Sequence, residues 1–270
     1  MSLSFRNLHA AGNPFILANA WDRGSACLLA GLGAKALATS SGAHAFTMGR
    51  PDLGTVTREE ALAHAEDIVS ATSLPVSGDF ENGFGDAPDI LEETVKLSAE
   101  IGLAGISIED ISLTDMKPYG FDLAVERIQA ASATARALPK DFILVARADG
   151  FMHGIYDLDE GIRRIQAFET AGADCVYIPF LHNLEAVAKV CRSVSIPVNV
   201  GISTVEGISL QEFANAGVAR VSLGMALATA THTTMHNLST SMFDHGDFSK
   251  LGDNLSYDVI DECVAKGRRA

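Results

Sequence analysis

Acidic side chains stand where short apolar segments end, and they are the residues of this chain best suited to bind a metal ion. Asp79 ends the segment 75–79, Glu81 follows two residues later, and Glu109 ends the segment 105–109. In an extended segment, side chains two residues apart point to the same face. Carboxylate oxygens are the ligands that Mg²⁺ prefers. The spacing therefore predicts a Mg²⁺ site, with Mn²⁺ as the alternative ion.

The same acids could instead have no metal to bind. In that interpretation one of them caps a helix and the others are ordinary loop residues exposed to water. Buried carboxylates are costly unless they are paired or bound to a cation. Which interpretation holds therefore depends on the elements that position these side chains.

Eight short apolar segments alternate with longer stretches rich in Ala and Leu. They lie at 15–20, 36–40, 75–79, 105–109, 142–147, 173–178, 197–200 and 220–223. Parallel strands joined by helical crossovers give this alternation, and eight such strands close a barrel. The sequence predicts a TIM (β/α)8 barrel in a single domain over residues 1–270.

Helices are predicted between these strands from their start and stop signals. The stretch 58–70 follows an N-cap at Thr57 and carries acids in its first turn. The stretches 90–101 and 158–171 end at Gly102 and Gly172, which are suitable C-terminal stops. Residues 224–270 exceed what one closing helix needs, so we expect an extended C-terminal helical segment.

In such barrels the reacting groups come from the carboxyl ends of the strands and the loops that follow. Besides the acids, these positions hold the following residues that could touch a substrate: Trp21, Ser41, Gly42, His44, Arg147 and Asn199. An arginine fork matches a carboxylate well, so Arg147 is the candidate cation of the site. The segment 112–120 could form a lid, or it could be a plain surface loop.

Five blocks of sequence in one order carry a resemblance to a known family. They are Asn19-Ala20-Trp21-Asp22, Ser40-Ser41-Gly42 with the segment 49–54, Gly78-Asp79-Phe80-Glu81 with the residues to 85, Ser107-Ile108-Glu109-Asp110, and Val145-Ala146-Arg147-Ala148-Asp149 with the residues to 151. They resemble the isocitrate lyase and phosphoenolpyruvate mutase superfamily. The resemblance implies a Mg²⁺-dependent barrel enzyme that acts on a 2-oxo acid through a pyruvate enolate.

The resemblance also implies a role for each candidate residue. Asp79 would bind the metal directly, with Glu81, Glu109 and Asp52 holding it through waters. Trp21, Ser41 and Gly42 would embrace the substrate carboxylate. His44 and Asn199 are candidates for the substrate site from their positions at strand ends alone, and His44 could instead be a loop histidine satisfied by the backbone. Arg147 would neutralise the enolate oxygens, so that Arg147, Glu109 and Asp52 are the implied catalytic residues.

Departures from the family pattern narrow the expected reaction. The segment 111–120 lacks the Lys-Lys-Cys-Gly-His motif of isocitrate and methylisocitrate lyases, and the sixth strand ends in Ile178-Pro179, without the histidine of the phosphonate-forming mutases. We therefore expect a lyase that cleaves a carbon–carbon bond in a small 2-oxo or hydroxy dicarboxylic acid. A phosphonomutase acting on phosphoenolpyruvate or carboxyphosphonoenolpyruvate is the alternative, and a non-catalytic metabolite-binding barrel is the alternative from another class.

Composition excludes several other classes of protein. A net charge of -14 disfavours nucleic acid as a partner. The expected ligand is the small carboxylate that the resemblance implies. The sequence shows neither a membrane-spanning apolar run nor a secretion signal, and its four cysteines are scattered, so we expect a cytoplasmic protein. The resemblance implies a homo-oligomer, a tetramer whose subunits exchange the last barrel helix.

Overall fold

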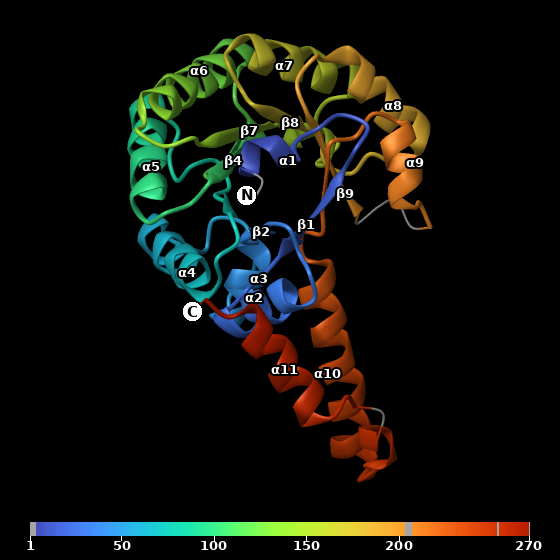
Figure 1. Cartoon of the computed structure of the whole chain (residues 1–270). Coiled ribbons are helices and arrows are strands. Elements are labelled where there is room, and N and C mark those ends of the chain that lie inside the picture. Colours follow the sequence, from blue (N-terminus) through green and yellow to red (C-terminus); the bar gives the residue numbers. More distant parts are fainter. Residues whose placement is uncertain (1–3, 203–206, 253, 270) are drawn as a thin grey trace.

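Eight parallel strands form a closed ring in the computed structural model, which describes residues 4–202, 207–252 and 254–269 (Figure 1). In ring order they are β1 (Phe15–Asn19), β2 (Leu37–Ala38), β3 (Val76–Asp79), β4 (Gly105–Glu109), β7 (Ile143–Arg147), β8 (Cys175–Tyr177), β9 (Val198–Gly201) and β10 (Arg220–Ser222). Only Gly201 falls outside the predicted segments. The TIM (β/α)8 barrel prediction is confirmed.

Helices surround the ring of strands. They are α2 (Arg23–Gly31), α3 (Ser41–Thr47), α4 (Arg58–Ala71), α5 (Pro88–Glu100), α6 (Phe121–Ala137), α7 (Leu158–Thr170), α8 (Leu184–Ser193) and α9 (Leu210–Asn215). The predicted N-cap of α4 is present, because Thr57 and Glu60 form a reciprocal capping box. The predicted stops Gly102 and Gly172 both have a left-handed backbone, with φ of 92° and 99°.

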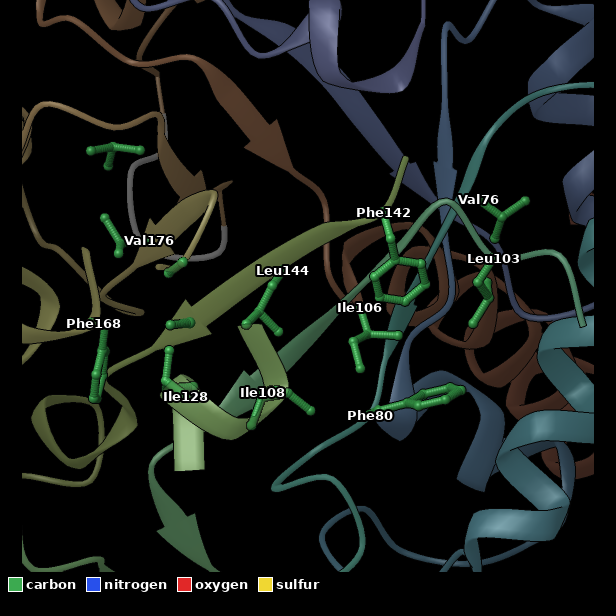
Figure 2. Close-up of a cluster of buried hydrophobic side chains, with 14 of the residues drawn as sticks. Val76, Phe80, Leu103, Ile106, Ile108, Ile128, Phe142, Leu144, Phe168 and Val176 are labelled. Atoms are coloured by element: carbon green, nitrogen blue, oxygen red, sulfur yellow. The ribbon is translucent and has the colours of Figure 1, made fainter. Parts of the chain in front are cut away.

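Apolar side chains fill the space between the strands and the helices. Figure 2 shows part of this layer, in which Ile106 and Ile108 of β4 and Leu144 of β7 pack with Ile128 of α6 and Phe168 of α7. All five side chains are buried. Because the strands alternate their side chains between two faces, the intervening residues of β4 and β7 must point into the barrel.

A short N-terminal helix, α1 (Phe5–Leu8), closes the amino-terminal end of the barrel. Its Phe5 and Leu8 belong to a second apolar cluster with the inward-facing Phe15 of β1, Val145 of β7 and others, and α1 lies within the outline of the ring (Figure 1). The lower half of the barrel is therefore a packed apolar plug. The polar side chains that line the barrel cavity lie above this plug.

The segment that could have formed a lid is a small hairpin outside the ring. Its strands β5 (Ile111–Ser112) and β6 (Lys117–Pro118) pair in antiparallel fashion. The Lys117 side chain is largely exposed and lies 3.6 Å from Asp115. A single 3-10 turn, η1 (Asp149–Phe151), follows β7.

The C-terminal residues form an arm that leaves the barrel, as expected from the surplus of chain after the eighth strand. Helix α10 (Ala226–His245) projects away from the ring, and a 3-10 turn, η3 (Ser249–Gly252), leads to the returning helix α11 (Tyr257–Gly267) (Figure 1). Helix α11 packs closely on α2, since a Cβ on Gly31 would lie 1.9 Å from the carbonyl oxygen of Cys263. No helix in the described ranges is long and apolar enough to cross a membrane.

Candidate active site

A cavity of about 620 Å³ lies at the carboxyl ends of the strands. It brings together side chains from several of the strand ends that were predicted to meet there. The predicted residues that line it are Ser41, Gly42, Asp52, Asp79, Glu109, Arg147 and Asn199. The barrel geometry places Ser41, Asp79, Glu109 and Arg147 together, because each follows or ends a strand whose carboxyl end faces this cavity.

Asp79, the last residue of β3, is held at the cavity by four donors. Its Oδ2 accepts from the backbone N–H of Ser41 at 3.1 Å and from the Ser41 hydroxyl at 3.2 Å. Its Oδ1 accepts from the Ser107 hydroxyl at 3.2 Å and from Nη1 of Arg147 at 2.8 Å. Each oxygen of this carboxylate accepts two hydrogen bonds, which fixes its orientation.

Arg147, the last residue of β7, is the central cation of the site. Besides Asp79, its guanidinium contacts Glu109 at 3.0 Å and binds Asp149 through two hydrogen bonds of 2.6 and 3.0 Å. Burial opposes the charge of Arg147, but the surrounding carboxylates, Asp149 foremost, raise its pKa well above the usual value. The group therefore stays a fixed positive charge.

The neighbouring acids Glu109 and Asp110 point to opposite sides of the strand end. Glu109 faces the cavity, whereas Asp110 binds Nη1 of Arg164 at 2.9 Å and the Tyr156 hydroxyl at 2.8 Å. Asp110 also accepts the backbone N–H of Asp149 at 2.7 Å. Glu109 is thus available to a ligand in the cavity. Asp110 stabilises the turn that positions the Asp149 carboxylate beside Arg147.

Carboxylates outnumber the cations around Arg147, and this imbalance shows in their pKa values. Burial raises the pKa of Glu109 well above its usual range even though Arg147 lies beside it. Burial also raises the pKa of Asp52, with the charge of Asp79 adding to the effect. The chain alone does not neutralise this group of acids, so the site favours a further positive charge.

Glu81 and His44 line a separate space of about 10 Å³ behind Asp79, and not the main cavity. Burial raises the pKa of Glu81 to about 7. Its Oε1 accepts the backbone N–H of Gly54 at 2.9 Å, while Oε2 is buried without a partner, as is Nε2 of His44. The His44 ring stacks on His64 with centroids 3.8 Å apart. Asp79 separates both residues from the main cavity, since it lines both spaces.

Trp21 does not line the cavity either. Its backbone N–H donates to the Ser25 hydroxyl at 3.1 Å, and its carbonyl oxygen lies 2.9 Å from Nε2 of His64. Two residues before Trp21, Asn19 at the end of β1 does line the cavity, and its Oδ1 accepts the backbone N–H groups of Leu223 and Gly224. The structure therefore brings Ser41 and Gly42 to the cavity without Trp21.

Tyr177 and Arg220 are among the residues of the cavity wall that were not singled out from the sequence. Tyr177 ends β8, and Arg220 begins β10. Strand ends alone do not reveal Arg220, because it lies at the other end of its strand. Period-two alternation could have found it, since Ser222 is two residues later and faces the same cavity.

The donor set of this site fits a hydrated divalent cation. Its polar atoms include carboxylate oxygens, which Mg²⁺ and Mn²⁺ prefer, and in the adjoining space behind Asp79 the Oε2 of Glu81 is buried without a partner. In the parts of the chain that the structure describes, no three acids, histidines or cysteines stand ready as a closed set of ligands. Mg²⁺ does not require one, because it is usually held by one or two carboxylates together with waters and substrate oxygens.

Comparisons with known proteins agree with this geometry. The family model described as phosphoenolpyruvate phosphomutase matches residues 5–243. The chain is 30% identical over 210 residues to 2-methylisocitrate lyase of Escherichia coli (strain K12), which covers 74% of this chain and 69% of that protein. It is 28% identical over 206 residues to oxaloacetate decarboxylase of Pseudomonas putida (strain GB-1), which covers 73% of this chain and 68% of that protein.

A crystal structure from Burkholderia cenocepacia J2315, of a protein provisionally assigned as a lyase/mutase, superposes with a TM-score of 0.91. Its sequence is 44% identical, and the match covers 96% of this chain and 93% of the other. Both the ring of strands and the arm therefore have a counterpart in a solved structure.

Proposed function

Since this chain belongs to the phosphoenolpyruvate phosphomutase family of lyases and phosphonomutases, we propose that it is a Mg²⁺-dependent carbon–carbon lyase. Its substrate class would be a small 2-oxo or hydroxy dicarboxylic acid, cleaved through a pyruvate enolate. The observation that carries the proposal is the arrangement of Asp79, Glu109 and Asp149 around one buried guanidinium, Arg147, at the wall of a cavity of about 620 Å³.

Four acids near Arg147 would hold the cation. Asp79 would bind it directly, with Asp52, Glu81 and Glu109 holding its waters. When bound, the cation supplies positive charge that stabilises an oxygen of the substrate as negative charge develops there. Burial raises the pKa values of Asp52, Glu81 and Glu109, so the charged form of each acid lacks sufficient compensating positive charge in the chain alone. A bound cation would supply that charge and favour the ionised form of each, which supports this assignment.

Residues of the chain itself would orient the substrate and neutralise the enolate. Ser41 begins α3, and its backbone N–H and hydroxyl reach the cavity beside Asp79, where they can meet a carboxylate. Gly42 leaves room at this point, since a Cβ there would lie 2.6 Å from Oδ2 of Asp52. Arg147 is held rigidly by three carboxylates, so its charge is preorganised for the enolate oxygens.

A screen of 2-oxo and hydroxy dicarboxylic acids of four to seven carbons, read as pyruvate release with Mg²⁺ or with EDTA, tests this function. We expect release with Mg²⁺ and none with EDTA. Asp79→Ala should abolish turnover and keep the fold, whereas the exposed Glu126→Ala serves as the matched control. Lack of turnover of every acid in the panel would overturn the lyase assignment. Conversion of phosphoenolpyruvate to a phosphonate would favour the phosphonomutase alternative.

The arm supports a further part of the proposal, assembly into a tetramer that exchanges α10 between subunits of a cytoplasmic enzyme. Only Ala228 and Ser241 of α10 are buried. Large apolar side chains on the arm are exposed in this single chain, including Met235 at 59%, Phe243 at 83% and Phe248 at 64%. Apolar surface of this kind is typical of a protein interface. A monomeric mass in solution would contradict the assembly.

A further inference from the structure

Arg220 is a buried cation without an acidic partner. Its side chain begins β10, points into the barrel and is only 3% exposed. Its Nε donates to Oδ1 of Asn199 at 2.8 Å, and its Nη1 lies 3.4 Å from Nε2 of His9. Within the described ranges, no Asp or Glu oxygen lies within 4.0 Å of its guanidinium. Both of these partners are therefore neutral acceptors.

His9 accepts from Arg220 as a neutral ring, and so it does not supply the missing charge. The Nδ1 of His9 lies 2.9 Å from the carbonyl oxygen of Phe5, which can only accept, so the proton of the neutral ring is on Nδ1. Nε2 is then free to accept from Arg220. Burial, together with the charge of Arg220, lowers the pKa of His9 to about 3, which agrees with this assignment.

The register of the strands connects Arg220 to the catalytic rim. Arg147 of β7 pairs with Tyr177 of β8, Tyr177 pairs with Asn199 of β9, and Asn199 pairs with Arg220. Residues paired across neighbouring strands share one face, so these four side chains form a continuous row inside the barrel. Because the strands are staggered, the row runs from the carboxyl end of β7 to the amino end of β10. One guanidinium therefore stands at the rim and another at the floor.

Both ends of this row line the same cavity. Arg147 and Arg220 are among its lining residues, as are Tyr177 and Asn199 between them. The Asn199 amide is fixed from both sides, because its Nδ2 donates to the Ser222 hydroxyl at 3.0 Å while its Oδ1 accepts from Arg220. Ser222 faces the cavity too. The floor thus presents a fixed arginine with polar neighbours to whatever fills the cavity.

We propose that Arg220 binds the second carboxylate of a dicarboxylic substrate at the floor of the cavity. The 2-oxo acid end of the same molecule lies at the rim, with Asp79 and Arg147. This assignment rests on the proposed function for the identity of the reacting end. A buried, unpaired guanidinium costs stability in a protein without its ligand, and an arginine fork binds a carboxylate in bidentate fashion. The residue would determine specificity for dicarboxylates over monocarboxylates.

Malate and lactate make a matched pair of ligands for the test, because lactate carries a methyl group where malate carries a carboxymethyl group that ends in the second carboxylate. We would measure the binding of each by calorimetry with Mg²⁺ present. The wild type should bind malate about 30-fold more tightly than lactate, as expected for charge-assisted hydrogen bonds to a buried arginine. Arg220→Met should bring this ratio to about one and leave lactate affinity within about twofold.

Two further variants separate binding from a structural role. His9→Gln disturbs the contact between α1 and Arg220 but leaves the cavity wall unchanged, so the ratio should persist. Arg220→Met should melt at or above the wild-type temperature, because it removes an unpaired buried charge. Should that variant fail to fold, Arg220→Lys carries the test, and its ratio should fall to an intermediate value because a lysine cannot bind in bidentate fashion.

The outcomes that overturn the proposal are distinct from failure of the lyase assignment. A malate preference that survives in Arg220→Met, an equal loss of both ligands, or a wild type that binds malate no better than lactate would each overturn it. The measurement requires no turnover. If the wild type is inactive but prefers malate in a way that depends on Arg220, the proposed reaction is wrong and the binding role of Arg220 stands.

Discussion

Gly42→Ala should damage the site by moving Asp52, and the structure gives the size of the effect. A Cβ at this position would lie 2.6 Å from Oδ2 of Asp52 and 2.6 Å from Sδ of Met225. Both contacts are well inside van der Waals distance, so both side chains must move. Met225 is flexible and can adapt. Asp52 cannot adapt as freely, because its Oδ1 accepts the backbone N–H of Leu53 at 2.8 Å. Pressure from the new methyl group therefore moves its carboxylate away from the proposed metal site.

The stability cost of this substitution should be modest, about 2 kcal/mol for a single extra methyl group, or about 5 °C in melting temperature. The effect on function should be larger. We expect the concentration of Mg²⁺ that gives half-maximal turnover to rise about tenfold or more, as for other residues that orient metal ligands. Melting curves and Mg²⁺ titrations of turnover on one protein preparation would measure both quantities.

Two controls make the reasoning about Gly42 refutable. Gly120→Ala adds the same methyl group where no atom lies within 4 Å, so it should change neither quantity. Adding Met225→Ala to Gly42→Ala relieves the contact with sulfur but not the contact with Asp52, so it should restore stability more than Mg²⁺ dependence. Full recovery of Mg²⁺ dependence in the double variant, or wild-type behaviour of Gly42→Ala, would refute the role given to Asp52.

Three other perturbations have defined outcomes. Arg147→Met leaves Asp79, Glu109 and Asp149 without their buried partner, so urea unfolding should show a loss of about 3–5 kcal/mol and turnover should vanish, whereas retained stability would contradict the charge balance. His9 has a folded pKa of about 3, below the unfolded value, so the unfolded state takes up the proton first as pH falls. His9 should therefore contribute a loss of about 2 kcal/mol in unfolding free energy from pH 7 to pH 5, and the change over this range should differ by about that amount between the wild type and His9→Gln. Phe243→Asp, at a side chain that is 83% exposed, should lower the mass measured by light scattering and leave the melting temperature of the chain nearly unchanged.

The fold could be predicted from local sequence signals, because each strand and helix carries a signal of its own that does not depend on distant residues. Short apolar runs mark the strands, and Thr57, Gly102 and Gly172 mark helix ends whose geometry depends only on neighbouring residues. A barrel then follows from the number of strands, since consecutive parallel strands can close in one way. The hairpin at β5 and β6 was not predicted, because its strands are two residues long and show no alternation.

The candidate site was only partly accessible to the same reasoning. Residues at strand ends converge by topology, which is why Asp79, Glu109 and Arg147 could be grouped from the sequence. The spacing of Asp79 and Glu81 suggested one shared face, but Glu81 has a left-handed backbone, with φ of 47°, and turns behind Asp79. Such a turn breaks the alternation of an extended strand. Spacing arguments hold only while the chain stays extended.

The row from Arg147 to Arg220 suggests how one barrel can keep its chemistry and change its substrate. Asp79, Ser41 and Arg147 are locked together by hydrogen bonds and ion pairs, so a change at any of them disturbs the others. Arg220 and Asn199 form a separate hydrogen-bonded group at the floor, joined to the rim only through the strand register and Tyr177. Substitutions at the floor can therefore alter which second group is accepted without moving the acids at the rim.

Because the barrel interior below Arg220 is an apolar plug formed with Phe5 and Phe15, a larger second group cannot extend further down. Under the proposed role of Arg220, the floor would limit the length of the substrate as well as its charge, and a dicarboxylate short enough to span from Arg147 to Arg220 would satisfy both limits.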